Sequence, residues 1–273
     1  MVAARVNGFP EDRCAAVAVR STSSYRGHMR EFAEMSPLET WYFHIDADDL
    51  VANAADEESR RLRERMATKA RMRVGERLIP KITEQVEHRL QFVESPPLAT
   101  RVHDERALRI VRRGIADYLQ TLDESRRFVL DRYSLEDYAV RVVGIGSVGT
   151  RCFVALLVCD DRNPLLLQIK EARPSVLAPF AGESPYANQG QRVVAGQRMI
   201  QAASDIFLGW LRARDGHDYF VRQLRDMKYS VPIDALEPCG LDRYADLCGW
   251  ALARAHARSG DAATIGGYLG RGD

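Results

Sequence analysis

The sequence predicts an α+β protein: a helical N-terminal half, an antiparallel sheet that carries one helix, and a C-terminal helix. Three observations predict it. Apolar residues recur at helical spacing in the first part of the chain, short β-branched segments separated by turn residues follow it, and an amphipathic stretch covers residues 241–258. We expect a helical region (1–136), a sheet region (137–228) and a C-terminal helical segment (229–273). A chain of 273 residues is long enough for about two domains.

Helix-start signals and apolar stripes predict the helices of the first region. Pro10 begins one helix, because proline fits the first turn and acids follow it at the positive end of the helix dipole. Ser36-Pro37-Leu38-Glu39 has the form of a capping box. Around Ser95–Pro97 the pattern is irregular. Three apolar stripes are expected to face a core: Tyr25, Met29 and Phe32; Leu62, Met66, Ala70, Val74 and Leu78; Leu108, Val111, Ile115, Tyr118 and Leu122.

The sheet region begins with three expected strands in antiparallel order. They cover residues 139–143, 150–159 and 165–170, and a turn at Asp160–Pro164 separates the last two. A helix is expected over residues 189–203. The pair Asp215-Gly216 is typical of a hairpin turn, so the segments on either side of it (206–210 and 219–224) are expected to pair as a second hairpin.

Composition and charge exclude several classes of protein. The 39 basic and 38 acidic residues leave a net charge of +1, whereas a nucleic-acid coat protein or a polybasic membrane binder needs an excess of positive charge. Apolar runs such as Phe153–Val158 are far shorter than the ~20 residues of a membrane span. Residues 1–8 lack the apolar core of a secretory signal. Five cysteines without a C-x-x-C pair predict reduced thiols in a cytoplasmic protein, with neither a disulfide framework nor a zinc site.

The segment Gly144-Ile145-Gly146-Ser147-Val148-Gly149 matches the pattern G-x-G-x-x-G, which two unrelated folds use to bind nucleotides. In a dinucleotide-binding fold the loop opens a helix. Here the apolar, β-branched segment Thr150–Val158 follows, and it predicts a strand. A glycine loop between two antiparallel strands is the protein-kinase arrangement, in which backbone amides cover the phosphates of ATP. Gly144, Gly146, Ser147 and Gly149 are therefore candidate phosphate-binding residues.

A kinase-like site also needs a lysine on the third strand, and Gln168-Ile169-Lys170 supplies one. Strand alternation places Lys170 on the face of Leu166 and Gln168. The residue type is notable, because only four of the 39 basic residues are lysines (69, 81, 170 and 228). A compact ammonium at this position suits phosphate oxygens. The structural alternative is a glycine hairpin with a solvated lysine at the end of a strand.

The next part of a kinase-like site is an acid on the following helix that pairs with the lysine. Residues 189–203 carry four glutamines but no Asp or Glu, so Glu171, Glu183 and Asp205 are the acids that could replace it. The strand from Tyr219 would then lead to the hinge beside the adenine. Gln223 and Asp226 are accordingly expected to border the base.

Five blocks of the sequence together resemble an uncharacterised bacterial family catalogued as domain of unknown function 2252. The resemblance extends over nearly the whole chain and includes Met35–Glu39 and Trp41-Tyr42 in the helical half. Family members look like permuted kinases. The blocks are Gly144–Arg151, Leu167–Ala172, Gln189–Val194, Arg222–Lys228 and Leu252–His256.

The resemblance also implies catalytic segments upstream of the region seen here. A G-D-x-H-x-x-N-like segment and a D-F-D-like segment are similar to the catalytic loop and the metal-binding aspartate of aminoglycoside-type phosphotransferases. This chain has neither. His44-Ile45-Asp46 begins like a catalytic loop, but Val51 stands where a magnesium-binding asparagine is needed, and no asparagine follows His256–Asp261. The aspartates at 46, 48 and 49 are expected in a solvated loop.

These observations predict a nucleotide-binding fragment or degenerate member of a kinase-like phosphotransferase. It would bind ATP with magnesium and would not catalyse alone, because a base and a metal-binding aspartate are missing. No catalytic residue and no protein-held metal is assigned, and the phosphate acceptor stays unknown. An alternative is a non-catalytic protein-interaction module without nucleotide. Nucleic-acid binding through the arginine-rich stretch 56–77 is disfavoured, because acids at five positions dilute its charge.

Overall fold

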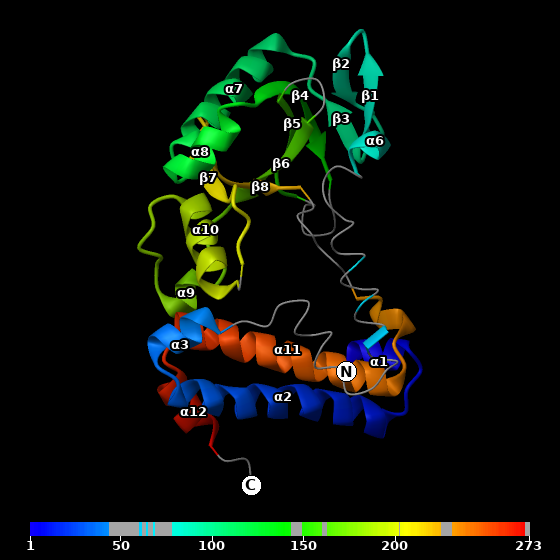
Figure 1. Cartoon of the computed structure of the whole chain (residues 1–273), viewed down its shortest axis with the longest axis vertical. Coiled ribbons are helices and arrows are strands. Elements are labelled where there is room, and N and C mark those ends of the chain that lie inside the picture. Colours follow the sequence, from blue (N-terminus) through cyan, green and yellow to red (C-terminus); the bar gives the residue numbers. More distant parts are fainter. Residues whose placement is uncertain are drawn as a thin grey trace. The chain divides into compact units, whose positions relative to one another are not determined.

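The computed structural model describes residues 1–43, 60–61, 64, 68, 78–142, 149–159, 163–201, 203–224 and 231–270 (Figure 1). The chain forms two compact units. The helical unit comprises residues 1–66, 199–202 and 230–273, and the sheet unit comprises residues 67–198 and 203–229. Helices and two antiparallel sheets are both present, which confirms the predicted α+β class. No helix within these ranges combines the length and apolar character needed to cross a membrane.

The helical unit is built around two long helices that run side by side in the same direction, α2 and α11 (Figure 1). The capping box predicted at Ser36–Glu39 is present at the start of α3. Met29 and Phe32 of α2 are buried against Ala253 of α11, as their helical spacing predicts. The helices of this unit are α1 (Val2–Val6), α2 (Glu11–Glu34), α3 (Pro37–Tyr42), the 3₁₀ turn η4 (Ile233–Ala235), α11 (Pro238–Ser259) and α12 (Ala262–Leu269).

The sheet unit contains a six-stranded antiparallel sheet with the order β3-β4-β5-β6-β8-β7. The predicted meander is confirmed as β4-β5-β6, and the predicted second hairpin as β7-β8 around Asp215-Gly216. The strands are β3 (Ala99–Arg101), β4 (Ser134–Arg141), β5 (Cys152–Cys159), β6 (Asn163–Ala172), β7 (Gly209–Arg212) and β8 (Asp218–Gln223). The helices are α6 (Ile79–Ile82), α7 (Glu105–Leu119), α8 (Glu124–Leu130), α9 (Ala178–Ala181) and α10 (Gln189–Ile200).

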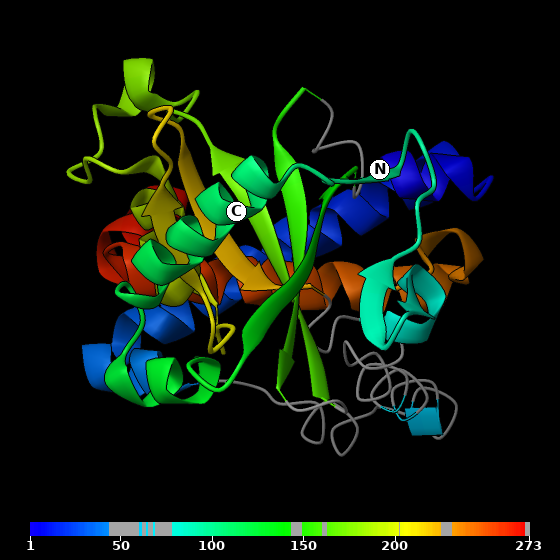
Figure 2. The ribbon, with the colours of Figure 1, turned by 90° about the horizontal axis from the view of Figure 1, so that it is seen from above.

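The two faces of this sheet carry different cores. One face buries Leu167 and Ile169 of β6 against α7 and α8, which lie over the strands in Figure 2. Its helical side comes from the stripe predicted at 108–122. The other face buries Leu166 of β6 with residues of α6 and of a small hairpin. Helix α10 lies on the opposite side of β7 and β8 from α7 and α8 (Figure 1). Lys170 belongs to the second face, because strand neighbours alternate.

The segment 83–101 was expected within a helical region, and it is a set of short strands. The strands β1 (Thr83–Val86) and β2 (Arg89–Phe92) form a hairpin, and β3 joins the large sheet. The hairpin turns at Glu87 and His88, which have φ values of 46° and 67°. A turn with two positive φ values usually carries Asn-Gly or Asp-Gly. This hairpin lacks that signal and its strands have four residues each, so the sequence pattern did not reveal it.

Several sequence features lie outside the described residues. They include most of the stripe at 62–78 and the arginine-rich stretch 56–77, of which only residues 60, 61, 64 and 68 are described along with Leu78. The acidic segment with aspartates at 46, 48 and 49 and the catalytic-loop-like start at His44 lie outside them too. The predictions made for these segments stay predictions.

Candidate functional site

The glycine loop joins two neighbouring antiparallel strands. The pair Val140 and Phe153 lies at the end of β4 and the beginning of β5, so the segment between them is a hairpin connection. Gly149 is described, and its φ of +76° is a left-handed conformation that glycine adopts without strain. Gly144, Gly146 and Ser147 lie outside the described residues. The strand that follows the loop confirms the hairpin connection and excludes a loop that opens a helix.

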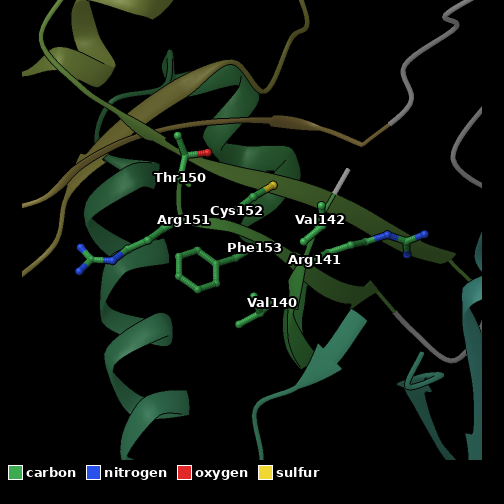
Figure 3. A pocket seen from close by; sticks show the side chains of 7 residues that line it. All are labelled: Val140, Arg141, Val142, Thr150, Arg151, Cys152 and Phe153. Carbon is green, nitrogen blue, oxygen red and sulfur yellow. The ribbon is translucent and has the colours of Figure 1, made fainter. Parts of the chain in front are cut away.

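A hollow of about 350 Å³ lies at the base of this loop. Figure 3 shows that the side chains of Arg141 and Arg151 extend to opposite sides of it. Arg151 is held by Asp215, with 3.5 Å between Nη1 and Oδ2. The hollow is lined by Val140, Arg141, Val142, Thr150, Arg151, Cys152 and Phe153. It therefore has a largely apolar wall with cationic groups at its margins.

Lys170 lies on β6 beside the start of the strand that follows the loop. It pairs directly with Cys152 of β5 on one side and with Phe220 of β8 on the other. Paired residues in an antiparallel sheet project to the same face, so these three side chains share one face of the sheet. Lys170 is partly buried, and its side chain makes neither an ion pair nor a hydrogen bond with the described residues. Its ammonium is thus a cation that the described part of the chain leaves without a partner.

None of the three acids considered from the sequence pairs with Lys170. Glu171 follows it on the strand and projects to the opposite face. Its carboxylate accepts hydrogen bonds from the Arg173 guanidinium at 3.0 Å and the Arg151 backbone N–H at 2.9 Å, and both lower the pKa of Glu171. Asp205 accepts from the backbone N–H of Phe207 at 2.8 Å, and Glu183 is exposed. The missing acid on the 189–203 helix is therefore not replaced by any of the three.

Gln168 and Arg222 complete the polar part of this face, and neither was selected from the sequence. Gln168 is 2% exposed, and its Nε2 lies 3.8 Å from the Cys152 Sγ. Arg222 donates from Nε to the Gln168 Oε1 at 3.3 Å. The sequence does contain one signal for Gln168, because it is a polar residue within the otherwise apolar run of β6. Cys152, Gln168, Lys170 and Arg222 thus form a polar strip across β5, β6 and β8.

Gln223 lies elsewhere than its predicted role implies. It pairs with Leu167, so its side chain is on the face opposite to Lys170, about 10 Å away along β8. Its backbone N–H and its side-chain Nε2 both donate to Asp205, the latter at 3.0 Å. Asp226, the other candidate for contact with the base, lies outside the described residues. Lys170 and Gly149 are brought to one end of the sheet, and the Gln223 side chain is not.

A buried carboxylate fixes α10 to the sheet. Asp218, 8% exposed, accepts hydrogen bonds from Arg212 Nε at 2.6 Å, from the Gln189 backbone N–H at 2.7 Å and from Asn188 Nδ2 at 3.0 Å. Burial alone would raise the pKa of Asp218, but the hydrogen bonds from Arg212 and Gln189 outweigh it and the pKa is lowered. Asp218 therefore holds the beginning of α10 through its charged form.

This lowered pKa predicts how stability depends on pH. The contribution of Asp218 is complete above its unfolded pKa, near 4, and is lost as the pH falls through the lower folded pKa. Asp218→Asn should destabilise the sheet unit by about 1–3 kcal/mol at pH 6. The difference from the wild type should shrink steadily from pH 4 to pH 2. Denaturant unfolding across that range measures it, and a difference that stays constant with pH would contradict the assignment.

The described residues were also inspected for a metal centre. No three His, Cys, Asp or Glu side chains in this part of the chain come close enough together to hold a metal ion. None of the five cysteines forms a disulfide with another, and three of them are buried.

Comparison with known proteins gives one match. A family model described as an uncharacterized protein conserved in bacteria (DUF2252) matches residues 1–273. No curated protein and no solved structure matches the chain.

Proposed function

The chain belongs to the DUF2252 family of uncharacterised bacterial proteins, and we propose that it is the nucleotide-binding portion of a kinase-like phosphotransferase. The observation that carries the proposal is the position of Lys170. It lies across from Cys152, three residues after Gly149, and no carboxylate of the described residues neutralises it. A glycine-rich hairpin and a lysine on the next strand are the parts that hold phosphates in kinases.

In this proposal the backbone N–H groups of the loop from Gly144 to Gly149 and the ammonium of Lys170 bind the phosphates. Glycine is needed because a Cβ would hinder close approach of the backbone to phosphate oxygens. The base would lie toward Arg222, which is partly exposed and whose guanidinium can hydrogen-bond to its edge. The segment at Asp226 would border the base from the hinge. Magnesium would enter bound to the phosphates of the nucleotide.

The proposal assigns binding to this chain and no phosphoryl-transfer step. Transfer needs a base that orients the acceptor and groups that hold the metal. The sequence shows neither in the kinase pattern, and the phosphate acceptor is not assigned. ATP binding is therefore the property to measure.

Lys170→Ala should weaken ATP binding at least about tenfold, because a charge-assisted contact to phosphate is lost. The free energy of unfolding without ATP should change by less than about 0.5 kcal/mol, since the residue has no partner to lose. ATP-dependent thermal shifts and calorimetric titration measure both. Lys81→Ala removes an exposed lysine from α6 and is the matched control, which should keep the wild-type affinity. An unchanged affinity in Lys170→Ala would exclude this phosphate site.

One observation favours the alternative of a protein-interaction module. Val176, Leu177 and Phe180, in and just before α9, are 85%, 62% and 87% exposed. Large apolar side chains that gather on a surface are typical of protein contacts. If the chain is an interaction module without nucleotide, its melting temperature should not respond to millimolar ATP. A melting temperature that rises with ATP concentration to a plateau would exclude the module without nucleotide and support the nucleotide site.

A further inference from the structure

Two arginines lie one turn apart on α11 in the helical unit. Arg254 is 3% exposed, and its Nε donates to the backbone carbonyl of Phe43. Arg258 donates from Nη1 to the carbonyl of Gln201 at 2.6 Å. The guanidinium of Arg258 also lies over the Trp41 ring, 3.9 Å from its centroid. The two positive charges therefore share one face of α11, beside α3.

No carboxylate in the described part of the chain pairs with either guanidinium. The acids on α11 are used elsewhere: Asp242 pairs with Arg13 and Asp246 with Arg20. Asp261, the next acid along the chain, accepts a hydrogen bond from the N–H of Thr264 at the beginning of α12. The groups that do contact the arginines are neutral carbonyls and an aromatic ring. Among the residues that the structure describes, no acidic side chain therefore neutralises these two positive charges.

The arrangement leaves donors unused. The Nε of Arg258 is buried and has no hydrogen-bond partner in the described residues, and the Nη groups of Arg254 have none there either. Burial lowers the pKa of both guanidiniums, and the charge of Arg258 adds to this effect at Arg254. Arginine nevertheless stays charged in proteins. Because an unpaired buried charge is costly, such a pair is expected where an anion binds.

We propose that Arg254 and Arg258, with Trp41 beside them, form a binding site for a phosphate group in its dianionic form. Two guanidiniums without an acidic partner among the described residues match a dianion in charge, and their planar forks match phosphate oxygens in geometry. Trp41 is 49% exposed, so the site is accessible from the solvent side of α3. Every residue of the site belongs to the helical unit, so this site is distinct from the one proposed at Lys170.

Thermal melting of the whole chain tests the proposal, with inorganic phosphate titrated at an ionic strength held constant by KCl. The wild type should show a saturable rise in melting temperature of about 3 °C at phosphate concentrations well above Kd. Arg254→Met and Arg258→Met remove one charge each and keep apolar bulk, so both should lose most of this rise. Arg254→Met should also melt no lower than the wild type without phosphate, because it replaces an unpaired buried charge.

Two control variants separate this site from other causes. Arg20→Met removes an arginine that is paired and half-exposed on α2, and it should keep the full phosphate response. Lys170→Ala should also keep it, even if that variant has lost ATP binding. A response that disappears in Lys170→Ala and persists in Arg254→Met would assign the phosphate to the nucleotide site and overturn the proposal. An equal rise with KCl alone would overturn it too.

A parallel titration with ribose 5-phosphate identifies the source of the phosphate group. A response at much lower concentration than for inorganic phosphate would show that the site takes a phosphomonoester. Equal responses would show that it takes free phosphate. No saturable response to either probe in the wild type would overturn the proposal.

Discussion

Gly249→Ala should destabilise the helical unit by about 3 kcal/mol and lower its melting temperature on the order of 10 °C. Gly249 lies where α11 crosses α2. A Cβ at this position would overlap the carbonyl oxygen of Ser21 and would lie 2.8 Å from the Cβ of Ser24 and 2.9 Å from the backbone N of Tyr25. Carbon atoms in contact are normally about 3.5–4.0 Å apart. Because the obstacles are mostly backbone atoms, the two helices would have to separate.

Gly240→Ala is the matched control on the same helix. The nearest atom to a Cβ there is the Cδ2 of Leu236 at 3.5 Å, which is an ordinary contact. Alanine should therefore be neutral or stabilise α11 by up to about 1 kcal/mol through its helix propensity. Circular dichroism during thermal unfolding measures both variants. Equal stability of Gly249→Ala and Gly240→Ala would show that α2 and α11 do not cross closely at Gly249.

Gly190→Ala should have a similar effect on the sheet unit, a loss of about 3 kcal/mol. A Cβ at residue 190 would overlap the carbonyl oxygen of Tyr219 and lie 2.7 Å from the carbonyl carbon. Helix α10 begins at this point, and Asp218 holds it there through the N–H of Gln189. Since the backbone of β8 cannot move without breaking its ladder with β6, α10 would be displaced from the sheet.

Gly196→Ala is the control on α10. Apart from its own helix, nothing in the described structure lies within 4 Å of a Cβ at that position, so alanine should stabilise the helix by about 0.5–1 kcal/mol. Denaturant unfolding followed by near-ultraviolet and far-ultraviolet circular dichroism measures both variants. A destabilisation by Gly196→Ala as large as that by Gly190→Ala would mean that helix flexibility, and not the contact with β8, explains the effect.

The parts of the fold that the sequence predicts well are those whose residues repeat a pattern. The stripe from Leu108 to Leu122 and the capping box at Ser36 were found because helical spacing and a reciprocal cap leave local signals. The strands around the glycine loop were found because they are apolar and bounded by turn residues. The hairpin β1-β2 was not, because its left-handed turn is formed by Glu87 and His88, residue types that do not signal such a turn.

The candidate site was only partly predictable for a related reason. The sequence identified Lys170 because lysine is rare in this chain and ends an expected strand. It did not identify Gln168 and Arg222 as neighbours, since their contact depends on the register between β6 and β8, and register is a tertiary property. It also could not reveal that Arg254 and Arg258 have no acidic partner within the described part of the chain. Such an absence becomes visible only when the surrounding side chains are placed.

The pairing of α2 with α11 joins segments that are roughly 200 residues apart in the chain, with most of the sheet unit between them. Closing so long a loop is entropically slow when the intervening chain is unfolded. The pairs β4-β5, β5-β6 and β7-β8 of the sheet unit join strands that are adjacent in the sequence, so they can form first. During synthesis, α2 therefore emerges long before its partner α11. Its apolar residues Met29 and Phe32 stay uncovered until Ala253 of α11 has been made. Proteolysis of nascent chains of increasing length would follow this order directly.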